Sequence, residues 1–455
     1  MANQLLTISM ITNRALPVLA NECVLTDKFN RQYDKEFGVK GFKIGATANV
    51  RRPPRYLGTF GPALNVEPSV ETYVPVSVNY QYHVDIQFNT INMLLDIDEF
   101  ESRFIRPACI AVGNRLDSDG AYVAFQQTAQ QGGIFGTSPT SFLTFALAKA
   151  TLVNEGMPRG MTPTVCLDPV SQATMADALK GLFNPQVDIS EIYENGMVAA
   201  KTAGFDWFED PNIATFTTGT LSGTPVLAGA TSAAGGTALL TSGWSQTGTF
   251  EISGLSNTTA SCVVGDILTV KGVYPVNPQN RNQYGKSLKQ FVVLPPGGYA
   301  PMVGSATTGG PQFATATLSH GTFNATTGLY TSNGSGLLTV TVGECLISGG
   351  QFQNCSNAPV SPYTVQINGA TTAVAAGVVS PQGLAFHRDA YAMVFVDLPL
   401  PRTAVEASRA YDEDLGVSIR MATQYTINND AEPTRLDVAY GFSSLYRTMG
   451  YRIAG

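Results

Sequence analysis

A run of alternating residues in the first quarter of the chain constrains its fold more than any other feature. Every even position from Val74 to Phe88 holds an apolar or aromatic residue, and the odd positions between them are mostly polar. Because successive side chains of a strand point to opposite faces, this alternation predicts one long β-strand. A shorter alternating run from Phe42 to Val50 predicts a partner limb. Together they indicate a long two-stranded hairpin, which is marginal in isolation and needs a partner surface.

A cationic stretch lies near the far end of this predicted hairpin. Arg51, Arg52 and Arg55 surround two prolines in a chain whose formal net charge is −7. A nucleic-acid site would need aromatic residues interleaved with the basic ones and a basic domain around it. The acidic chain disfavours that interpretation. We therefore expect these arginines to contact a neighbouring copy of the chain, with a merely solvated turn as the alternative.

An acidic cluster later in the chain offers a counter-surface for these arginines. Asp412, Glu413 and Asp414 lie together, and no helix start explains them as it explains the acidic residues near Asp96. Clusters of this kind are most often solvated loops, and that interpretation stays open. The favoured hypothesis is an inter-subunit contact.

Helical patterns precede and follow the hairpin. Residues 1–40 are predicted to be helical and to divide at Pro17. Asp96 and Glu99 form a capping box that begins a long helix, in which Pro107 removes one backbone hydrogen bond and predicts a bend.

Two more helices flank a predicted buried strand, "PTVCLD". The first begins at Ser138-Pro139 and ends near Gly156, and the second runs from Asp168 to Gly181. A short further helix is expected from Asp188. This part of the chain is of the α+β class.

The charge content falls abruptly after the helices. Between Leu221 and Ala385 only seven residues are charged, and Gly, Ser and Thr are abundant. Short strands and turns of this composition predict an all-β domain. Ordinary charge content returns after Phe386, where "AYAMVFVDL" predicts a buried strand and a hairpin follows. The simplest organisation is one α+β domain interrupted by an inserted β domain.

The residues of common enzyme and metal sites are missing. His387 and Asp389 form the sequence "HRDAYA", but no GxSxG elbow supplies a nucleophile for them to activate. No His or Cys pair has a metal-ligand spacing, and no phosphate-binding glycine loop opens a helix. We therefore expect no enzyme activity and no cofactor. The six cysteines are predicted to be isolated thiols, and we expect a soluble cytoplasmic product without signal peptide or membrane span.

Five segments, in order along nearly the whole chain, resemble the major capsid proteins of tailed bacteriophages, which have the Hong Kong 97-type fold. Within that fold, the chain is similar to the P-twenty-two-like coat family with an inserted β domain. The segments are "VRRPPR" at 50–55, "RFIRPACIAVGNRLD" at 103–117, "GDILTVKGVYPVNPQN" at 265–280 with "QFVV" at 290–293, "AFHRDAYAMVFVDLPLP" at 385–401 and "SIRMATQYTINNDAEPTRLDVAYG" at 418–441.

The resemblance implies a domain organisation. Its expected parts are an N-terminal helical arm at 1–40, an extended β-hairpin loop at 41–90, a peripheral domain with a spine helix at 91–150, the first part of an axial domain at 151–220, an inserted all-β, barrel-like domain at 221–385 and the C-terminal axial and peripheral part at 386–455.

The resemblance also implies a function. The chain would be a structural subunit that self-assembles, as hexamers and pentamers, into the icosahedral shell around a double-stranded DNA genome, without sequence-specific DNA binding. Expected partners are a scaffolding protein, a portal and decoration proteins, and assembly would take place in the host cytoplasm. The alternative is a β-rich decoration or tail-associated binding protein, motivated by the charge-poor insertion.

Overall fold

The computed structural model describes most of the chain. The described residues are 8–31, 47–78, 80–89, 101–179, 202–228, 239–240, 243–256, 259–285, 287–296, 298, 303–304, 311–313, 317–357, 359, 364–368, 377–402, 404–412, 417–428 and 431–455. The chain divides into two compact units. The first unit comprises Met1–Asn49, Pro75–Ala121 and Tyr391–Ser443, and the second comprises Val50–Val74, Tyr122–Ala390 and Ser444–Gly455.

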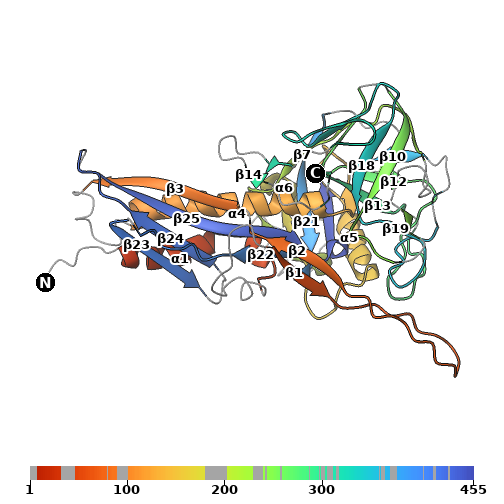
Figure 1. Cartoon of the computed structure of the whole chain (residues 1–455), viewed down its shortest axis with the longest axis horizontal. Helices are drawn as coiled ribbons and strands as arrows, with labels where there is room; N and C mark the ends of the chain where they lie inside the picture. The colour runs from red at the N-terminus through yellow and green to blue at the C-terminus, as the bar shows by residue number, and fades with distance from the viewer. Residues whose placement is uncertain are drawn as a thin grey trace. The chain divides into compact units, whose positions relative to one another are not determined.

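The first unit is built on a five-stranded sheet. Strand β25 (Ala431–Ser444) lies inside the sheet, pairs with β24 and β22, and also pairs antiparallel with β3 along ten residue pairs. Helix α1 (Ile8–Glu22) packs along β23 and β24 (Figure 1). The remaining elements of this unit are η1 (Thr26–Lys28), β3 (Tyr80–Asn89), the π-helical turn η3 (Glu101–Ile105), the start of α4 (Arg106–Gln127), β22 (Tyr391–Phe395), β23 (Glu406–Asp412) and β24 (Val417–Thr423).

The strand predicted from Val74 to Phe88 is two strands. Strand β2 (Thr72–Ser77) pairs with β1 (Thr47–Arg52), as the predicted hairpin requires, whereas β3 pairs with β25. The alternation itself is confirmed from residue 80 to residue 87 of β3, because the even-numbered residues there are half-buried and the odd-numbered ones are exposed. The prediction of a single ribbon was wrong because a period-two pattern fixes which face is buried and not which strand lies alongside.

Two prolines differ in their effect on helices. Pro17 lies inside α1, so the predicted division of the segment there is wrong. Ile11, Ala15 and Leu19 on the same helix are fully buried, and this packing offsets the hydrogen bond that the proline removes. Pro107 is the second residue of α4 and lies two residues after the end of the π-helical turn, so the irregular backbone hydrogen bonding falls next to the proline. The bend at Pro107 stays a prediction.

The second unit contains a six-stranded mixed sheet with two helices. Its order is β4-β26-β21-β5-β6, and β7 also pairs with β21. Phe145 and Leu152 of α5 pack in one core with Trp207 of β6 and Ile453 of β26. The elements are β4 (Gln131–Gly133), α5 (Phe142–Asn154), β5 (Thr164–Leu167), α6 (Pro169–Leu179), η4 (Thr202–Gly204), β6 (Asp206–Glu209), β7 (Thr215–Thr217), β21 (Val379–Phe386), η5 (Arg388–Ala390), η6 (Arg447–Met449) and β26 (Gly450–Ala454).

Helix α5 begins later than its sequence predicts. Ser141, and not Ser138, accepts a hydrogen bond from the Leu143 N–H and caps the helix. The strand predicted at "PTVCLD" is β5, and α6 begins at Pro169 as expected. The helix predicted from Asp188 lies outside the described residues.

The charge-poor segment forms a second six-stranded sheet in this unit, with the order β20-β12-β13-β18-β10-β8 (Figure 1). Three smaller sheets, β11-β17-β16, β14-β15 and β19-β9, complete it. The bounds are β8 (Gly223–Leu227), β9 (Leu239–Leu240), β10 (Thr247–Leu255), β11 (Ser261–Val263), β12 (Ile267–Val270), β13 (Gln290–Leu294), β14 (Val303–Gly304), β15 (Pro311–Gln312), β16 (Thr322–Asn324), β17 (Leu329–Thr331), β18 (Leu338–Gly343), β19 (Leu346–Ile347) and β20 (Val365–Ile367). We call the strands from β8 to β20 the inserted strands.

The chain enters and leaves the inserted strands at one place. Thr218 donates a backbone hydrogen bond of 3.1 Å to Val378, and Gly377 donates one of 3.3 Å to Thr218. Strand β21, which begins before the predicted end of the insertion at residue 385, pairs with β5 and β26. The bounds of the insertion, 221–385, stay a prediction.

Candidate assembly surface

The chain between β1 and β2 forms an irregular extension of the hairpin. Figure 1 shows this segment running as a narrow double limb beyond both strands, and we take it together with the last two residues of β1, as residues 51–71. We call it the hairpin extension. It carries large apolar side chains in solvent, among them Phe60, which is fully exposed, and Leu64, which is 91% exposed. Single exposed apolar residues are ordinary, but a group of them on a thin segment makes that segment a candidate interaction site.

Side-chain contacts join the two limbs of the hairpin extension. Both limbs contribute, so side chains hold the two limbs together where no strand pairing does. The contacts are an ion pair of 3.3 Å between Arg51 and Glu71, a hydrogen bond of 3.0 Å from the Tyr56 hydroxyl to Ser69, and one of 2.5 Å from the Leu57 N–H to Glu67.

The three arginines predicted to act together differ in their surroundings. Arg52 is half-buried, donates to the Leu445 carbonyl and lies 5.2 Å from the centre of the Tyr446 ring. The Arg51 side chain is 80% exposed even though it pairs with Glu71, and Arg55 is exposed. Arg51 and Arg55 are therefore presented to solvent, whereas Arg52 is engaged within its own chain.

The predicted acidic counter-surface is described only in part. Asp412 is the last residue of β23, and Glu413 and Asp414 lie outside the described residues. The contact of this cluster with arginines of another copy stays a prediction.

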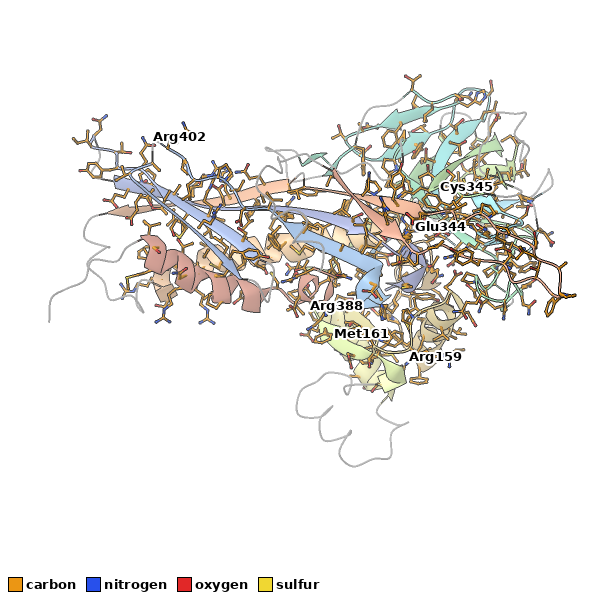
Figure 2. All side chains as sticks on the ribbon, turned by 60° about the horizontal axis from the view of Figure 1, so that its bottom comes forward. Arg159, Met161, Glu344, Cys345, Arg388 and Arg402 are labelled. Carbon is orange, nitrogen blue, oxygen red and sulfur yellow. The ribbon has the colours of Figure 1, made fainter. Side chains whose placement is uncertain are left out.

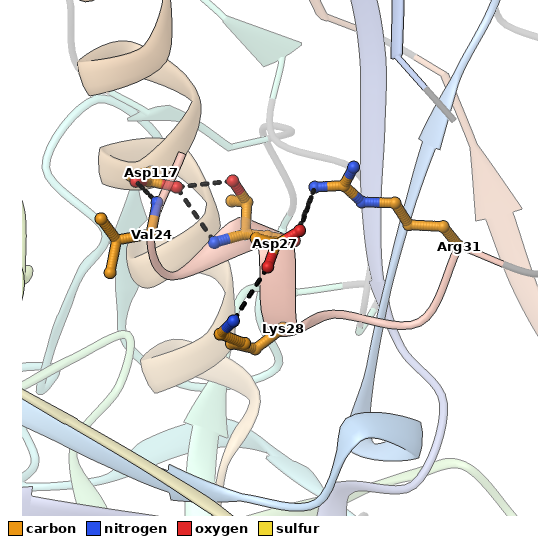
Figure 3. Close-up of polar contacts among 6 residues, drawn as sticks. Val24, Asp27, Lys28, Arg31 and Asp117 are labelled. Atoms are coloured by element: carbon orange, nitrogen blue, oxygen red, sulfur yellow. Dashed lines mark hydrogen bonds and ion pairs between the residues drawn. The ribbon is translucent and has the colours of Figure 1, made fainter. Parts of the chain in front are cut away.

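A clasp in the first unit attaches the segment after α1 to α4 (Figure 3). Asp117 of α4 is fully buried, and its carboxylate accepts hydrogen bonds of 2.8 Å from the Val24 N–H, 3.0 Å from the Thr26 N–H and 2.5 Å from the Thr26 hydroxyl. Nearby, Asp27 pairs with Lys28 at 2.9 Å and with Arg31 at 3.9 Å in a more exposed position. Sequence patterns did not single out Asp117, because a carboxylate in the middle of a helix is usually solvated.

A buried charge cluster in the second unit joins α5 to the inserted strands. The Lys289 ammonium lies 3.6 Å from the Glu155 carboxylate and 3.9 Å from that of Glu344, which is labelled in Figure 2. Tyr284 donates a short hydrogen bond to Glu155. Burial alone would lower the pKa of Lys289, but the two carboxylates outweigh it and the pKa is raised. The cluster borders a cavity of about 300 Å³.

A second buried cation connects the last strand with the inserted strands. Arg452 of β26 is fully buried and donates to the carbonyl oxygens of Phe125 at 3.1 Å and Gly265 at 2.6 Å. It also donates to the Gln131 side chain at 2.8 Å. An arginine near the chain end gave no sequence signal of burial, and only the fold shows that it fixes β26 in place.

Asp266 is buried beside this arginine. Its carboxylate accepts hydrogen bonds of 2.7 Å from the Val263 N–H and 3.0 Å from the Asn368 amide. Burial raises the pKa of Asp266 to about 6, although these donors and Arg452 act in the opposite direction. The site is closed to solvent, so its role lies in the folded state of the subunit.

His387 and the six cysteines are buried, whereas His83 is exposed and His320 is partly exposed. His387 is fully buried, its Nδ1 atom lies 3.6 Å from Asp389, and burial lowers its pKa. All six cysteines are free and buried. Within the described ranges, no group of three His, Cys, Asp or Glu residues is arranged to hold a metal ion. No helix of that part of the chain is long and apolar enough to cross a membrane.

The family model of the P22 coat protein, gene protein 5, matches residues 55–304, which is more than half of the chain. The chain belongs to the P22 coat protein family. A comparison with curated proteins found no match.

Among solved structures, the chain is similar to several from bacteriophages, at low identity and low TM-score. A Mycobacterium phage Che8 structure has a TM-score of 0.40 and 10% identity and covers 95% of this chain and 90% of its own. The capsid structure of cyanophage P-SCSP1u has a TM-score of 0.38 and 9% identity, with 90% and 83% covered. The mature capsid of bacteriophage PhiM1 has a TM-score of 0.38 and 7% identity, with 94% and 87% covered.

Family membership gives the class of protein. The chain is a structural major capsid protein of a bacteriophage, of the Hong Kong 97-type α+β fold, and its copies associate into the capsomers of an icosahedral capsid in the virion. The predicted family, fold class and function are thereby confirmed, and the alternative of a decoration or tail-associated protein is set aside.

Proposed function

We propose that the hairpin extension is the surface through which one subunit contacts the next in the shell. The observation that carries this proposal is the exposure of Phe60 and Leu64 on a segment that projects from β1 and β2. Exposed apolar surface of this kind is unfavourable in a subunit that stays alone. Burial against a neighbouring copy removes it from water, and repetition around a closed shell multiplies a small gain.

Charge complementarity supports the same contact. Arg51 and Arg55 are presented to solvent on the hairpin extension. The acidic cluster of Asp412, Glu413 and Asp414 is the proposed partner surface on the neighbouring copy. Exposed ion pairs contribute little each, so we assign them to the register of the contact more than to its strength.

The domain organisation follows the family pattern in our proposal. Residues 1–40 act as the N-terminal arm, 41–90 as the extended loop, 91–150 as the peripheral domain, 151–220 and 386–455 as the two parts of the axial domain, and 221–385 as the insertion. The adjacent backbone of Thr218 and Val378 supports an insertion into a continuous domain.

The remaining partners belong to the same proposal. The shell encloses double-stranded DNA without reading its sequence, and a net charge of −7 supports weak contact with phosphate. A scaffolding protein, a portal and decoration proteins assist assembly, which takes place in the host cytoplasm. The subunit has a structural role and no catalytic one.

Sedimentation velocity tests the hairpin contact on purified protein. The Arg51→Glu/Arg55→Glu variant and the Phe60→Ser/Leu64→Ser variant are expected to give folded subunits that form no shells, because each removes one component of the contact. Arg52 is left unchanged because it is engaged within its own chain.

A matched control separates the contact from net charge. Arg159→Glu/Lys271→Glu makes the same change of charge at two other exposed positions and is expected to assemble like the parent. Normal shells from both hairpin variants would refute the proposed contact.

A further inference from the structure

The hairpin extension is anchored at its root. Arg52, the last residue of β1, donates to the Leu445 carbonyl, and its guanidinium lies over the Tyr446 ring at 5.2 Å. A guanidinium over an aromatic face is attracted by the negative charge on that face. The root of the hairpin extension is thus tied to the segment that precedes β26 by two different interactions.

A second anchor lies on the returning limb, at Pro68, four residues before β2. The Gln351 side chain, in the loop after β19, donates a hydrogen bond of 2.9 Å to the Pro68 carbonyl. Pro68 belongs to the returning limb of the hairpin extension, so this bond ties that limb to the inserted strands. The two anchors lie on different limbs of the hairpin extension, and two points of attachment restrict its direction more than one would.

Packed side chains of the inserted strands line a cavity next to the root of the hairpin extension. Residues 52–55 border a cavity of about 150 Å³ whose other side includes Trp244, Phe352 and Asn354. Trp244 and Phe352 pack with Cys345 and Ile347 in a small hydrophobic core of the inserted strands. Side chains that belong to a packed core hold their positions, so Trp244 and Phe352 give the anchors a rigid base.

The anchored segment keeps its apolar side chains in solvent. Phe60 and Leu64 remain exposed while Arg52 and Pro68 are engaged. The cross-limb contacts of Arg51, Tyr56 and Leu57 join residues 51–57 to residues 67–71, so two anchors orient the base from which Phe60 and Leu64 project.

We propose that the inserted strands are the seat of the hairpin extension in the single subunit, that is, the surface that holds this segment in one direction. Through Gln351, and together with the Arg52 anchor, they set its direction before a second copy binds. This inference rests on the proposed contact of the hairpin extension with a second copy, and it adds a role for the insertion in that contact. A segment that is already oriented loses less conformational freedom on binding, so association is favoured.

Distance measurements between two spin labels test the seat in the soluble subunit. Labels on Phe60→Cys and Ser335→Cys place one probe on the hairpin extension and one on an exposed turn of the inserted strands, and the native thiols are all buried. We expect one narrow distance distribution. It should broaden with Gln351→Ala and broaden further when Arg52→Ala is added.

The control is Gln279→Ala, which removes another glutamine amide from the inserted part of the chain. Gln279 is exposed and makes no hydrogen bond to residues 51–71 in the described structure. It should leave the distribution unchanged. With unlabelled protein, Gln351→Ala should raise the subunit concentration needed for shell formation roughly fivefold, the factor that one hydrogen bond contributes to an equilibrium.

The outcomes separate this inference from the proposed function. A distribution that is broad in the parent, or that Gln351→Ala and Arg52→Ala leave unchanged, overturns the seat even if the hairpin variants fail to assemble. A narrow distribution that the anchors control supports the seat even in a subunit whose hairpin contact is disproved, because the measurement needs no assembly.

Discussion

Asp266 shows, at the scale of one residue, how burial makes the stability of the subunit depend on pH. Its pKa of about 6 lies above the ordinary 3.8, so between these values the folded chain binds a proton that the unfolded chain does not. The stability gained from this proton is complete below about pH 4. It is lost as the pH rises through 6, where the buried carboxylate becomes charged.

Replacement of Asp266 by Asn removes this titration. We expect the free energy of unfolding of the parent, relative to Asp266→Asn, to fall as the pH rises from 4 to 7, by at most about 3 kcal/mol for a shift of roughly two pH units. Urea unfolding followed by tryptophan fluorescence at several pH values measures the difference. A difference that is constant, or that grows with pH, would contradict the assignment.

At the scale of elements, the clasp around Asp117 holds the chain after α1 against α4. Two backbone N–H groups and one hydroxyl donate to the Asp117 carboxylate. The carboxylate is fully buried, so water cannot take the place of these donors. Short helices depend on packing more than on their own propensity, and α1 with its internal Pro17 depends on it strongly. The clasp therefore stabilises the element as well as its attachment.

Asp117→Ala is expected to lower the free energy of unfolding by about 2–4 kcal/mol, because buried donors lose a charged acceptor. The matched control is Asp27→Ala, whose side chain is 35% exposed and pairs with Lys28 and Arg31. It should cost less than about 1 kcal/mol. Thermal unfolding and protease cleavage near residue 25 measure both, and equal effects of the two variants would show that the clasp is unimportant.

At the scale of the whole molecule, the inserted strands have the properties of an autonomous unit. Their six-stranded sheet has its own buried residues, such as Phe250, Ile252 and Val340. Their two ends meet at Thr218 and Val378. A segment whose ends meet needs little from the surrounding chain to close.

Residues 219–377 expressed alone are therefore expected to fold as a β domain. Well-dispersed amide signals in an NMR spectrum would show it, and the shorter boundary should give a better-behaved protein than 221–385, which includes β21. Collapsed signals for both fragments would mean that Arg452 and the Lys289 cluster, which join the inserted strands to the rest of the second unit, are essential for folding.

The sequence by itself determined the local elements and the class of the protein. The alternation in β3, the buried strand β5 and the charge-poor β segment are local patterns, since side-chain period and composition depend on neighbours in sequence. The resemblance in five segments led to the family for the same reason. No local pattern, however, indicates which distant group meets a side chain.

Only the tertiary structure decided the pairings between distant parts of the chain. It placed β3 beside β25, engaged Arg52 with Leu445 while leaving Arg51 and Arg55 exposed, and buried Arg452 against Gly265. Such contacts depend on chain closure over hundreds of residues, and a buried polar group is stabilised only by the partner that the fold supplies. Residues that look alike in sequence acquire different roles for that reason.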